Sequence, residues 1–473
     1  MNTTTTLTLV DGASIVVPDS LNLITTYVLR EQMDWFEDEI KFLRRLLQPG
    51  HRVIDIGANY GVYTLSMAKR VGPTGCVWAF EPASSTAKLL AASIAANNFG
   101  QVILALSALS SVKGTAQLSL NDNSELNALV HDSKSGGATE TVVLSTLDEC
   151  LETNDWQAIE FLKIDAEGEE GNILLGGKRF FARESPLIQY EIKAGTELHL
   201  ELVHAFTELG YDSYRLVPGL DLLVPFDEKE LADGYLLNLF SCKPDRAAQL
   251  ADRGFLADTA TIRRVRKARS NSVPGDLHSV QTSDPLAALI KFPYGETCAD
   301  LWREHLAAGK NSGVEAALLL YQQSRDDSSS AAERFVALES AFTGLRTICE
   351  AQPAYLRLSS LARVARDYGA RSLAVESLLQ LYNTILQQGQ VDLSEPFLAP
   401  GERFESVSPQ NAIGNWVAAA ALEEFERNCA FSSFYTGASA LHRLEIIQEL
   451  GFGSPEMARR LKLARLRFGK SHS

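Results

Sequence analysis

The sequence predicts a doubly wound α/β fold in the first half of the chain and an all-α domain in the second half. Between residues 51 and 244, short apolar runs alternate with helical segments, which is typical of a sheet covered by helices on both faces. After residue 285, Ala, Leu, Arg, Glu and Gln dominate and strand-like alternation is missing. A chain of 473 residues also exceeds what one ordinary hydrophobic core can organise.

These patterns divide the chain into four expected segments. They are an N-terminal cap segment (1–50), the α/β domain (51–244), a linker (245–284) and a helical accessory domain (285–473). The linker contains a short basic run, so an exposed helix with a solvated face is the other interpretation. In the last segment, Tyr355–Tyr368 and Arg371–Gln388 resemble a helical hairpin of a repeat protein, although no clean period is found.

The elements can be placed in chain order. An amphipathic helix is expected at about Asp34–Leu47, after a short strand-like stretch. The strand candidates of the α/β domain are Arg52–Ile56, Cys76–Phe80, Val102–Leu106, Phe161–Ile164, Leu187–Ile192, Ser213–Leu216 and Leu236–Ser241. Helices are expected between them, as at Val62–Arg70, Ser85–Asn97 and Glu169–Leu175. An extra strand pair, Thr115–Leu120 and Thr141–Leu144, flanks a polar loop.

Composition excludes several classes of protein. The formal net charge of −15 makes the chain a poor general binder of nucleic acid, so we expect no nucleic-acid partner. Six scattered cysteines without metal-ligand spacing indicate neither a zinc site nor a disulfide framework. We expect a cytoplasmic protein, because no signal segment and no apolar run of membrane-spanning length is found.

The strongest local signal follows the first strand of the α/β domain. Asp55 precedes a glycine-rich turn that contains Gly57, Asn59 and Gly61, and a helix begins there. Glycines allow the backbone to turn tightly and to approach a ligand closely. A carboxylate at this place would repel a pyrophosphate but suits a zwitterionic ligand with an ammonium group, such as S-adenosyl-L-methionine. Asn59 is also suited to a left-handed turn conformation.

Two further positions complete the predicted donor site. Glu81 lies at the carboxyl end of the second strand, where an acidic residue can bind both hydroxyls of a ribose. A solvated carboxylate before Pro82 is the alternative interpretation of Glu81. Ser107, just past the third strand, is placed to lie beside the adenine.

A third signal places acidic residues at the ends of two later strands. Asp165 and Glu167 follow the strand Phe161–Ile164, and Glu191 ends another strand. Because ligands collect beyond the carboxyl ends of the strands in an open α/β sheet, these carboxylates should stand at the rim of the site. The neighbouring Glu169 and Glu170 are explained by the dipole of the helix that follows.

Together these segments resemble the FkbM family of methyltransferases. The resemblance covers roughly residues 51–192 and rests on Asp55-Ile56-Gly57-Ala58-Asn59-Tyr60-Gly61, Phe80-Glu81-Pro82, Asn97-Asn98, Leu147-Asp148, Lys163-Ile164-Asp165-Ala166-Glu167-Gly168 and Gln189-Tyr190-Glu191-Ile192. It implies a Rossmann-like class I methyltransferase sheet. It also implies methyl transfer from S-adenosyl-L-methionine, typically to a hydroxyl oxygen of a sugar, glycan or secondary metabolite.

An in-line displacement then needs alignment of oxygen, carbon and sulfur, and a hydroxyl acceptor gains from a general base. Asp165 and Glu167 are the candidates, and Glu191 is next. His131 in the polar loop is a further but weaker candidate, since a lone loop histidine is usually solvated. As an alternative, the three carboxylates could hold Mg²⁺, although the sequence shows no ligand cluster that demands a metal.

Two other functional classes are open from the sequence. In the first, the chain is a donor-binding but non-catalytic scaffold, whose helical half holds a protein partner or mediates self-association. In the second, it is an NAD-dependent oxidoreductase, which Asp55 and Asn59 in the glycine turn disfavour. The predicted partner of the first half is a small-molecule or glycan acceptor, and no membrane span is expected.

Overall fold

The structure is a computed structural model that describes residues 3–130, 138–194, 197–229, 233–271, 286–308 and 313–469. The chain forms two compact units. The first comprises 1–216, 225–230 and 236–253, and the second comprises 217–224, 231–235 and 254–473. The main division therefore falls after Arg253, whereas the sequence placed it near residue 244.

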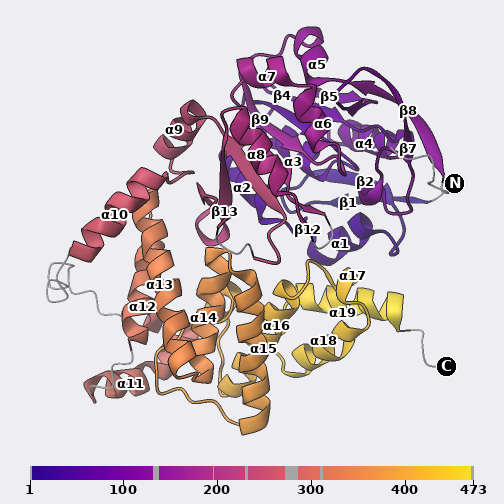
Figure 1. Ribbon diagram of the computed structural model, residues 1–473. Coiled ribbons are helices and arrows are strands. Elements are labelled where there is room, and N and C mark those ends of the chain that lie inside the picture. Colours follow the sequence, from indigo (N-terminus) through magenta and orange to yellow (C-terminus); the bar gives the residue numbers. More distant parts are fainter. Residues whose placement is uncertain are drawn as a thin grey trace. The chain divides into compact units, whose positions relative to one another are not determined.

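An eight-stranded sheet forms the centre of the first unit, although most of its edge strand at 222–225 falls within the residues assigned to the second (Figure 1). Its order is β14 (Leu222–Pro225), β13 (Asp212–Val217), β15 (Asn238–Cys242), β10 (Leu187–Glu191), β9 (Ile159–Ile164), β3 (Arg52–Ile56), β4 (Cys76–Phe80) and β5 (Val102–Ala105). The strands from β10 to β5 are parallel, and β15 pairs antiparallel with β10 and with β13. The predicted Rossmann-like sheet is thus confirmed.

The strand order creates a switch point between β3 and β9. From β3 the chain proceeds outwards to β4 and β5, and it later returns to β9 on the other side of β3. In open α/β sheets, ligands bind in the crevice that such a reversal opens beyond the carboxyl ends of the strands. The residues that follow β3 and β9 are therefore the ones placed to form a site.

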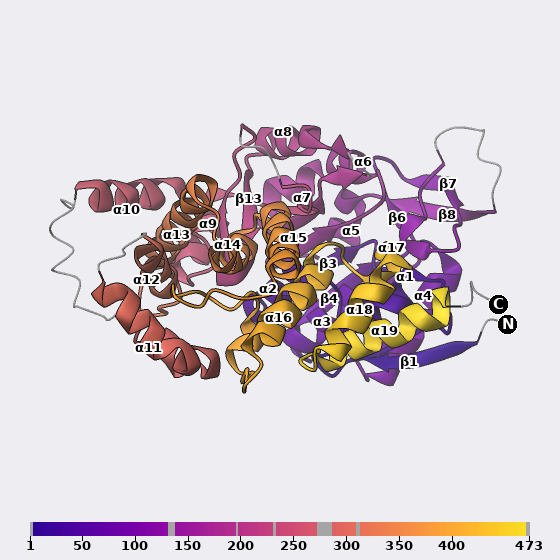
Figure 2. The ribbon, with the colours of Figure 1, turned by 90° about the horizontal axis from the view of Figure 1, so that it is seen from below.

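Helices cover both faces of this sheet (Figure 2). On one side lie α2 (Asp38–Leu46), α3 (Val62–Val71) and α4 (Ser84–Ala96), and on the other lie α5 (Leu147–Thr153), α6 (Glu170–Leu175), α7 (Lys178–Arg183) and α8 (Leu200–Glu208). Ile54 and Ile56 pack into one core with residues of α5 to α8. Because side chains alternate along a strand, Asp55 points to the opposite face.

Smaller elements surround the sheet. The hairpin β1 (Thr4–Thr8) and β2 (Ser14–Pro18) and the helix α1 (Ile24–Gln32) precede α2. The predicted extra pair is present as β7 (Gly114–Ser119) and β8 (Thr139–Ser145), joined by β6 (Ala108–Leu109). The short helix η1 (Ser124–Leu126) follows β7, and β11 (Lys193–Ala194) and β12 (Glu197–Leu198) form a two-residue ladder. The helix α9 (Pro244–Asp252) ends the unit.

The second unit is helical, as predicted. It contains α10 (Thr259–Asn271), α11 (Pro293–Ala307), α12 (Val314–Ser324), α13 (Ala331–Ala351), α14 (Tyr355–Tyr368), α15 (Arg371–Gln388), α16 (Ile413–Asn428), α17 (Ser433–Thr436), α18 (Ser439–Glu449) and α19 (Pro455–Phe468). Consecutive helices from α12 to α16 pack against each other. The neighbouring helices α12 and α13 differ in length, with 11 and 21 residues, and so do not show a regular repeat unit. The repeat-like interpretation therefore stays a prediction.

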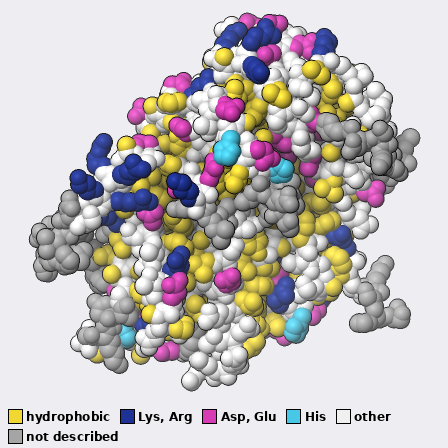
Figure 3. All heavy atoms as spheres, in the orientation of Figure 1, with side chains coloured by type: hydrophobic (Ala, Val, Ile, Leu, Met, Phe, Trp, Pro, Cys, Tyr) yellow, Lys and Arg dark blue, Asp and Glu magenta, His cyan; other side chains and the backbone are white. Residues whose placement is uncertain are grey.

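Three further features bear on the sequence-based expectations. The expected linker contains α9 and α10, and the exposed arginines and lysine of α10 form the dark-blue group at its position in Figure 3. The proline-rich segment before α16 places Phe397 and Phe404 in the helical core. All six cysteines are free thiols. In the described part of the chain, we find no helix with the length and apolar character that crossing a bilayer requires.

Candidate functional site

The turn between β3 and α3 forms the floor of the candidate site. Gly57 has φ +78°, and a Cβ atom there would lie 1.7 Å from the backbone oxygen of Asp165. The residue must therefore be glycine if β3 and β9 are to stay adjacent. Asn59 adopts the predicted left-handed conformation, with φ 48°. Gly61, at φ 98°, is the N-cap residue of α3 and packs against Leu90 instead of lining the cavity.

Glu81 closes this turn from the end of β4. Its Oε2 accepts a hydrogen bond from the backbone nitrogen of Asn59, and its Oε1 accepts one from Ala83, both at 2.9 Å. Each carboxylate oxygen has a second lone pair, so both can still accept a hydrogen bond from a ligand hydroxyl. The side chain is buried, and this burial raises the pKa of Glu81 to about 7 despite the two backbone donors. The alternative of a solvated turn carboxylate is wrong, because Glu81 is only 6% exposed.

Asp55 is fully buried at the end of β3 and is only partly satisfied. Its Oδ2 accepts a hydrogen bond of 2.5 Å from Thr64 on α3. Its Oδ1 has no hydrogen-bond partner among the described residues. Burial raises the pKa of Asp55, and the positive charge of Lys163 and the Thr64 hydrogen bond act against it. A buried carboxylate oxygen without a partner is costly unless a ligand supplies the missing donor.

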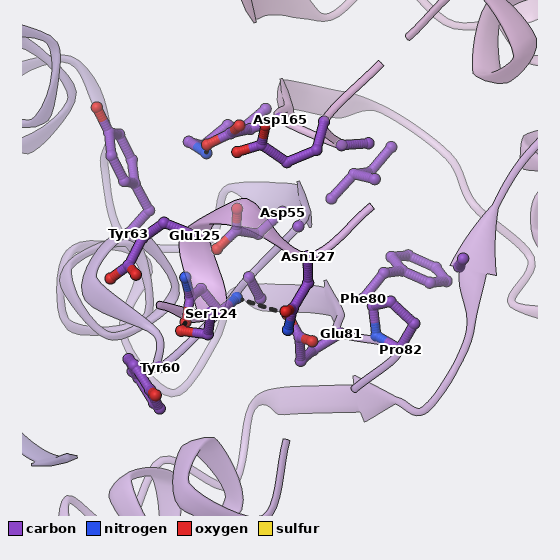
Figure 4. A pocket seen from close by; sticks show the side chains of 18 of the residues that line it. Asp55, Tyr60, Tyr63, Phe80, Glu81, Pro82, Ser124, Glu125, Asn127 and Asp165 are labelled. Carbon is purple, nitrogen blue, oxygen red and sulfur yellow. Dashed lines mark hydrogen bonds and ion pairs between the residues drawn. The ribbon is translucent and has the colours of Figure 1, made fainter. Parts of the chain in front are cut away.

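A cavity of about 1040 Å³, its open mouth included, lies beyond these strand ends (Figure 4). Seven acidic residues line it, namely Glu37, Asp55, Glu81, Glu125, Asp165, Glu167 and Glu169. Among the described lining residues, Lys163 is the only basic one. Apolar walls come from residues such as Phe80 and Leu109. The cavity is therefore large enough for a nucleoside with an amino-acid tail and favours positively charged ligands.

The three carboxylates proposed from the sequence as bases lie together. One side-chain oxygen each of Asp165, Glu167 and Glu191 falls within 4.8 Å of the other two. Asp165 is ion-paired at 2.5 Å with Lys163, whose side chain is 6% exposed. Burial of the carboxyl group and the charge of Asp165 raise the pKa of Glu167 to about 8, although part of this residue reaches solvent. The same two causes raise the pKa of Glu191 to about 9.

The same three oxygens are close enough to share a divalent cation, as the alternative hypothesis requires. Lys163 pairs with Oδ2 of Asp165, so a divalent cation on these oxygens would stand close to a buried positive charge. Methyl transfer that is unaffected by EDTA would remove the metal hypothesis.

Most residues predicted for the site are brought together. Those that line the cavity are Asp55, Gly57, Asn59, Glu81, Ser107, Asp165 and Glu167. Glu191 lies close to Asp165 and Glu167 but is not one of the described lining residues. His131 lies outside the described residues. Glu170 accepts hydrogen bonds from the backbone nitrogens of Ala166 and Gly168, in agreement with a role at the start of a helix.

Several lining residues were not found from the sequence. Thr25, Trp35 and Glu37 come from the N-terminal cap segment, and Ser124, Glu125 and Asn127 come from the loop around η1. These two segments are joined, since the carboxylate of Glu125 accepts a hydrogen bond of 3.2 Å from the backbone nitrogen of Thr25. No local pattern marks them, because their place depends on how the chain folds over the sheet. Lys163 could have been found, because a lysine inside the apolar strand β9 signals a buried ion pair.

Comparison with known proteins identifies the region that carries this site. Residues 55–213 match the family model described as "Methyltransferase FkbM domain", which confirms the resemblance. The match spans the residues from β3 to the start of β13 and includes the glycine turn, Glu81 and Asp165. A comparison with curated proteins found no match.

Solved structures include similar chains at low identity. Methyltransferase FkbM from Methylobacillus flagellatus KT is 14% identical, with a TM-score of 0.28 over 41% of this chain and 43% of that chain. The match thus spans less than half of that relative. A SAM-dependent O-methyltransferase from Thermotoga maritima is 14% identical, with a TM-score of 0.25 over 50% of this chain and 77% of that one. TYW2 of M. jannaschii, crystallised with AdoMet, is 14% identical, with a TM-score of 0.28 over 51% and 86% of the two chains.

Proposed function

We propose that this chain, whose residues 55–213 form an FkbM methyltransferase domain of the S-adenosylmethionine-dependent class, transfers a methyl group to a hydroxyl of a sugar, glycan or secondary metabolite. A cytoplasmic location is part of the same proposal. The helical unit, which lies outside the family match, would hold a protein partner or mediate self-association.

The partner-free Oδ1 of Asp55 is the observation that carries the donor assignment. S-adenosylmethionine would bring an ammonium group that can donate to this oxygen, and Gly57 lines the same cavity beside Asp55. The two oxygens of Glu81 would accept hydrogen bonds from the ribose hydroxyls. The acidic lining also offsets the positive charge of a sulfonium.

The chemistry then needs little from the protein beyond alignment and a proton acceptor. When bound, the donor supplies a methyl group that its sulfonium already activates. Asp165 lies in the cavity wall as the partner of a cation, so it is the carboxylate placed to accept the hydroxyl proton of the acceptor. Glu167, whose pKa is raised to about 8, carries a proton near neutral pH and can donate a hydrogen bond to the acceptor. Glu191, whose pKa is raised to about 9, lies close to Glu167 but is not one of the described lining residues.

Isothermal titration of the full chain with S-adenosylmethionine tests the donor site. Asp55→Asn should weaken binding at least 100-fold, because it removes the charge that faces the ammonium group while it keeps the size of the side chain. The matched control Asp367→Asn in the helical unit should leave the affinity unchanged. Equal affinities for wild type and Asp55→Asn would contradict the assignment.

Incubation with methyl-labelled donor and a small-molecule extract tests the transfer itself. We expect label in hydroxyl-bearing metabolites, detected by mass spectrometry as O-methyl products. Donor binding without any label in any extract would instead support the non-catalytic scaffold. Binding of a nicotinamide nucleotide in place of the sulfonium donor would revive the oxidoreductase alternative.

A further inference from the structure

A buried row of polar side chains crosses three neighbouring strands of the sheet. In the register of β3, β9 and β10, Asp55 lies opposite Lys163, and Lys163 lies opposite Gln189. Side chains at paired positions of parallel strands point to the same face. Lys163 therefore occupies the middle of this row, with Asp55 at the donor side, and only 5% of the residue is exposed.

The ammonium group of Lys163 is bound from several directions. Its Nζ lies 2.5 Å from Oδ2 of Asp165 and 4.8 Å from the centre of the Tyr63 ring. Burial alone would favour the neutral amine. The charges of Asp165, Asp55 and Glu37 outweigh burial, and they hold the pKa of Lys163 above its ordinary value. The side chain is thus a permanent buried cation.

Lys163 lies beside a cluster of three carboxyl groups, those of Asp165, Glu167 and Glu191. Two unit charges 4 Å apart repel each other by about 4 kcal/mol at the effective dielectric constant of a protein surface. Oxygens of Asp165, Glu167 and Glu191 all lie within 4.8 Å of one another, so the three groups cannot all be charged cheaply. Of these three, Asp165 has an ion pair with Lys163 in the described structure.

We propose that Lys163 is a positioning residue that decides which of the three carboxyl groups acts as the base. It holds Asp165 by Oδ2, orients that carboxylate among its acidic neighbours and leaves Oδ1 for the acceptor. Lys163 itself neither accepts the proton nor touches the methyl group. This inference rests on the proposed function, because it concerns the base of the same reaction.

The assisted step balances in atoms and charge. The acceptor O–H bond breaks and its proton moves to Oδ1 of Asp165, while the acceptor oxygen forms a bond to the methyl carbon. The carbon–sulfur bond breaks, and its electron pair stays on sulfur as a thioether. The negative charge of Asp165 and the positive charge of the sulfonium disappear together, and the charge of Lys163 is unchanged.

Several other titratable side chains surround Lys163 and Asp165 and can contribute to a pH profile. They come from every element that packs around the pair and comprise Asp55 on β3, Glu37 before α2, Tyr63 on α3, Glu191 on β10, Glu167 and Glu170 around the start of α6, and Glu125 on η1. Apart from Tyr63 these groups are acidic. Removal of the cation therefore leaves Asp165 among carboxyl groups alone.

The first test compares Lys163→Met with Lys113→Met. Lys113 forms an ion pair of the same 2.5 Å length with Glu149, but its side chain is 75% exposed and lies away from the cavity. The rate of label transfer from methyl-labelled S-adenosylmethionine to a small-molecule extract is measured from pH 4 to 9 at saturating donor. Lys163→Met should lower the maximal rate at pH 7 about 100-fold, the size of a lost general base. Lys113→Met should leave the rate unchanged.

Three readouts separate positioning from a structural role. The acidic limb of the rate profile of Lys163→Met should move to higher pH, because the variant lacks the positive charge beside the base. The apparent KM for the extract should change much less than the maximal rate. The double variant Lys163→Met/Asp165→Asn should be no slower than Asp165→Asn alone, since Lys163 acts through Asp165. Additive losses in the double variant would overturn the proposal.

A second measurement does not require Lys163 to be replaced. In the wild-type chain labelled with ¹⁵N-lysine, the ammonium group of Lys163 should give a slowly exchanging NMR signal that shifts in Asp165→Asn. A signal that does not move would overturn the proposed pairing even if Lys163→Met fails to fold. If wild type transfers no label at all, the proposed function fails. If wild type is active and Lys163→Met keeps its rate and its pH profile, only the positioning role fails.

Discussion

The ion-pair network of α16 in the helical unit and the cavity of the sheet unit hold buried charged side chains in different ways. In the helical unit, Glu423 on α16 is fully buried, and its carboxylate is paired with Arg427 at 2.9 Å and with Arg403 at 3.3 Å. Glu426, one turn further on, is paired with Arg443. Arg427 reaches Glu456 on α19 as well, at 3.0 Å. Each of these buried acids is thus ion-paired with arginines of its own unit, although burial raises the pKa of Glu423 as well.

The cavity of the sheet unit lacks such a balance. Seven acidic side chains line it, and Lys163 is the only basic residue among the described lining residues. Asp55 keeps one oxygen without a hydrogen-bond partner, and burial raises the pKa values of Asp55, Glu81 and Glu167. The acids of this cavity are therefore held in an environment that opposes their charge.

This difference separates a structural arrangement from a functional one. A buried charge that lacks a partner costs several kcal/mol, so it persists where a ligand completes it. Clusters of perturbed acids in a cavity therefore indicate binding or catalysis, while a closed network of ion pairs fixes how helices pack. Variants of each unit should consequently respond in different properties.

The largest effect is expected when the balanced network is broken. Glu423→Gln removes the carboxylate that Arg403 and Arg427 share and leaves two partly buried cations with less compensation. The free energy of unfolding, measured by urea denaturation, should fall by about 4 kcal/mol. Donor affinity should stay unchanged, because Glu423 belongs to the other unit.

An exposed pair of the same unit is the control for this variant. Glu350 and Arg346 form an ion pair of 3.1 Å on α13, with side chains 64% and 54% exposed. Glu350→Gln should change the free energy of unfolding by less than about 0.5 kcal/mol. Equal effects of Glu423→Gln and Glu350→Gln would contradict the distinction between the two units.

The next effect is a pH dependence that arises in the cavity. The pKa of Glu81 is raised from its ordinary value of 4.5 to about 7, so the folded state binds the proton more tightly than the unfolded state does. The stabilisation is complete below pH 4.5 and is lost as the pH rises through 7. Between pH 4.5 and 8, the ligand-free chain should lose about 3 kcal/mol of unfolding free energy through this group.

Urea denaturation of wild type and Glu81→Gln at both pH values isolates this contribution. Glutamine does not titrate, so its curve should lack about 3 kcal/mol of the decline that wild type shows. Glu350→Gln serves again as the control and should follow wild type. Parallel declines in wild type and Glu81→Gln would show that the carboxyl of Glu81 is not perturbed.

The sequence predicted the sheet unit well where local patterns decide the structure. The bounds of β3 and β4 were predicted to the residue, because apolar runs, a glycine turn and a proline delimit them. The donor-side residues Asp55, Asn59 and Glu81 follow from their places at the ends of these strands. The helices α14 and α15 also have the predicted bounds, since Gly369 and Gly389 end them in left-handed conformations.

Other features depended on contacts between distant parts of the chain. The helix α1 and the strand β14 were missed, the first because its sequence is rich in β-branched residues and the second because its apolar run is very short. Glu37 reaches the cavity only because the N-terminal segment folds back over α3, where Tyr63 donates a hydrogen bond to it. The closeness of Glu191 to Asp165 required the order of the strands, which residue spacing does not reveal.

The smallest effect concerns the loop around η1, whose polar contacts are partly exposed and can be replaced by water. Ser124 donates a hydrogen bond of 2.8 Å to Oδ1 of Asn59 and so ties this loop to the glycine turn. Ser124→Ala should weaken donor binding only about fivefold, the worth of one neutral hydrogen bond of about 1 kcal/mol. The control is Ser119→Ala, which removes a hydrogen bond of 3.0 Å to the backbone oxygen of Ala128. Ser119 is not one of the described lining residues, so the donor affinity of this variant should match wild type. Donor affinity could instead fall 100-fold in Ser124→Ala, as is expected for Asp55→Asn. That result would mean that the loop around η1 binds the donor directly.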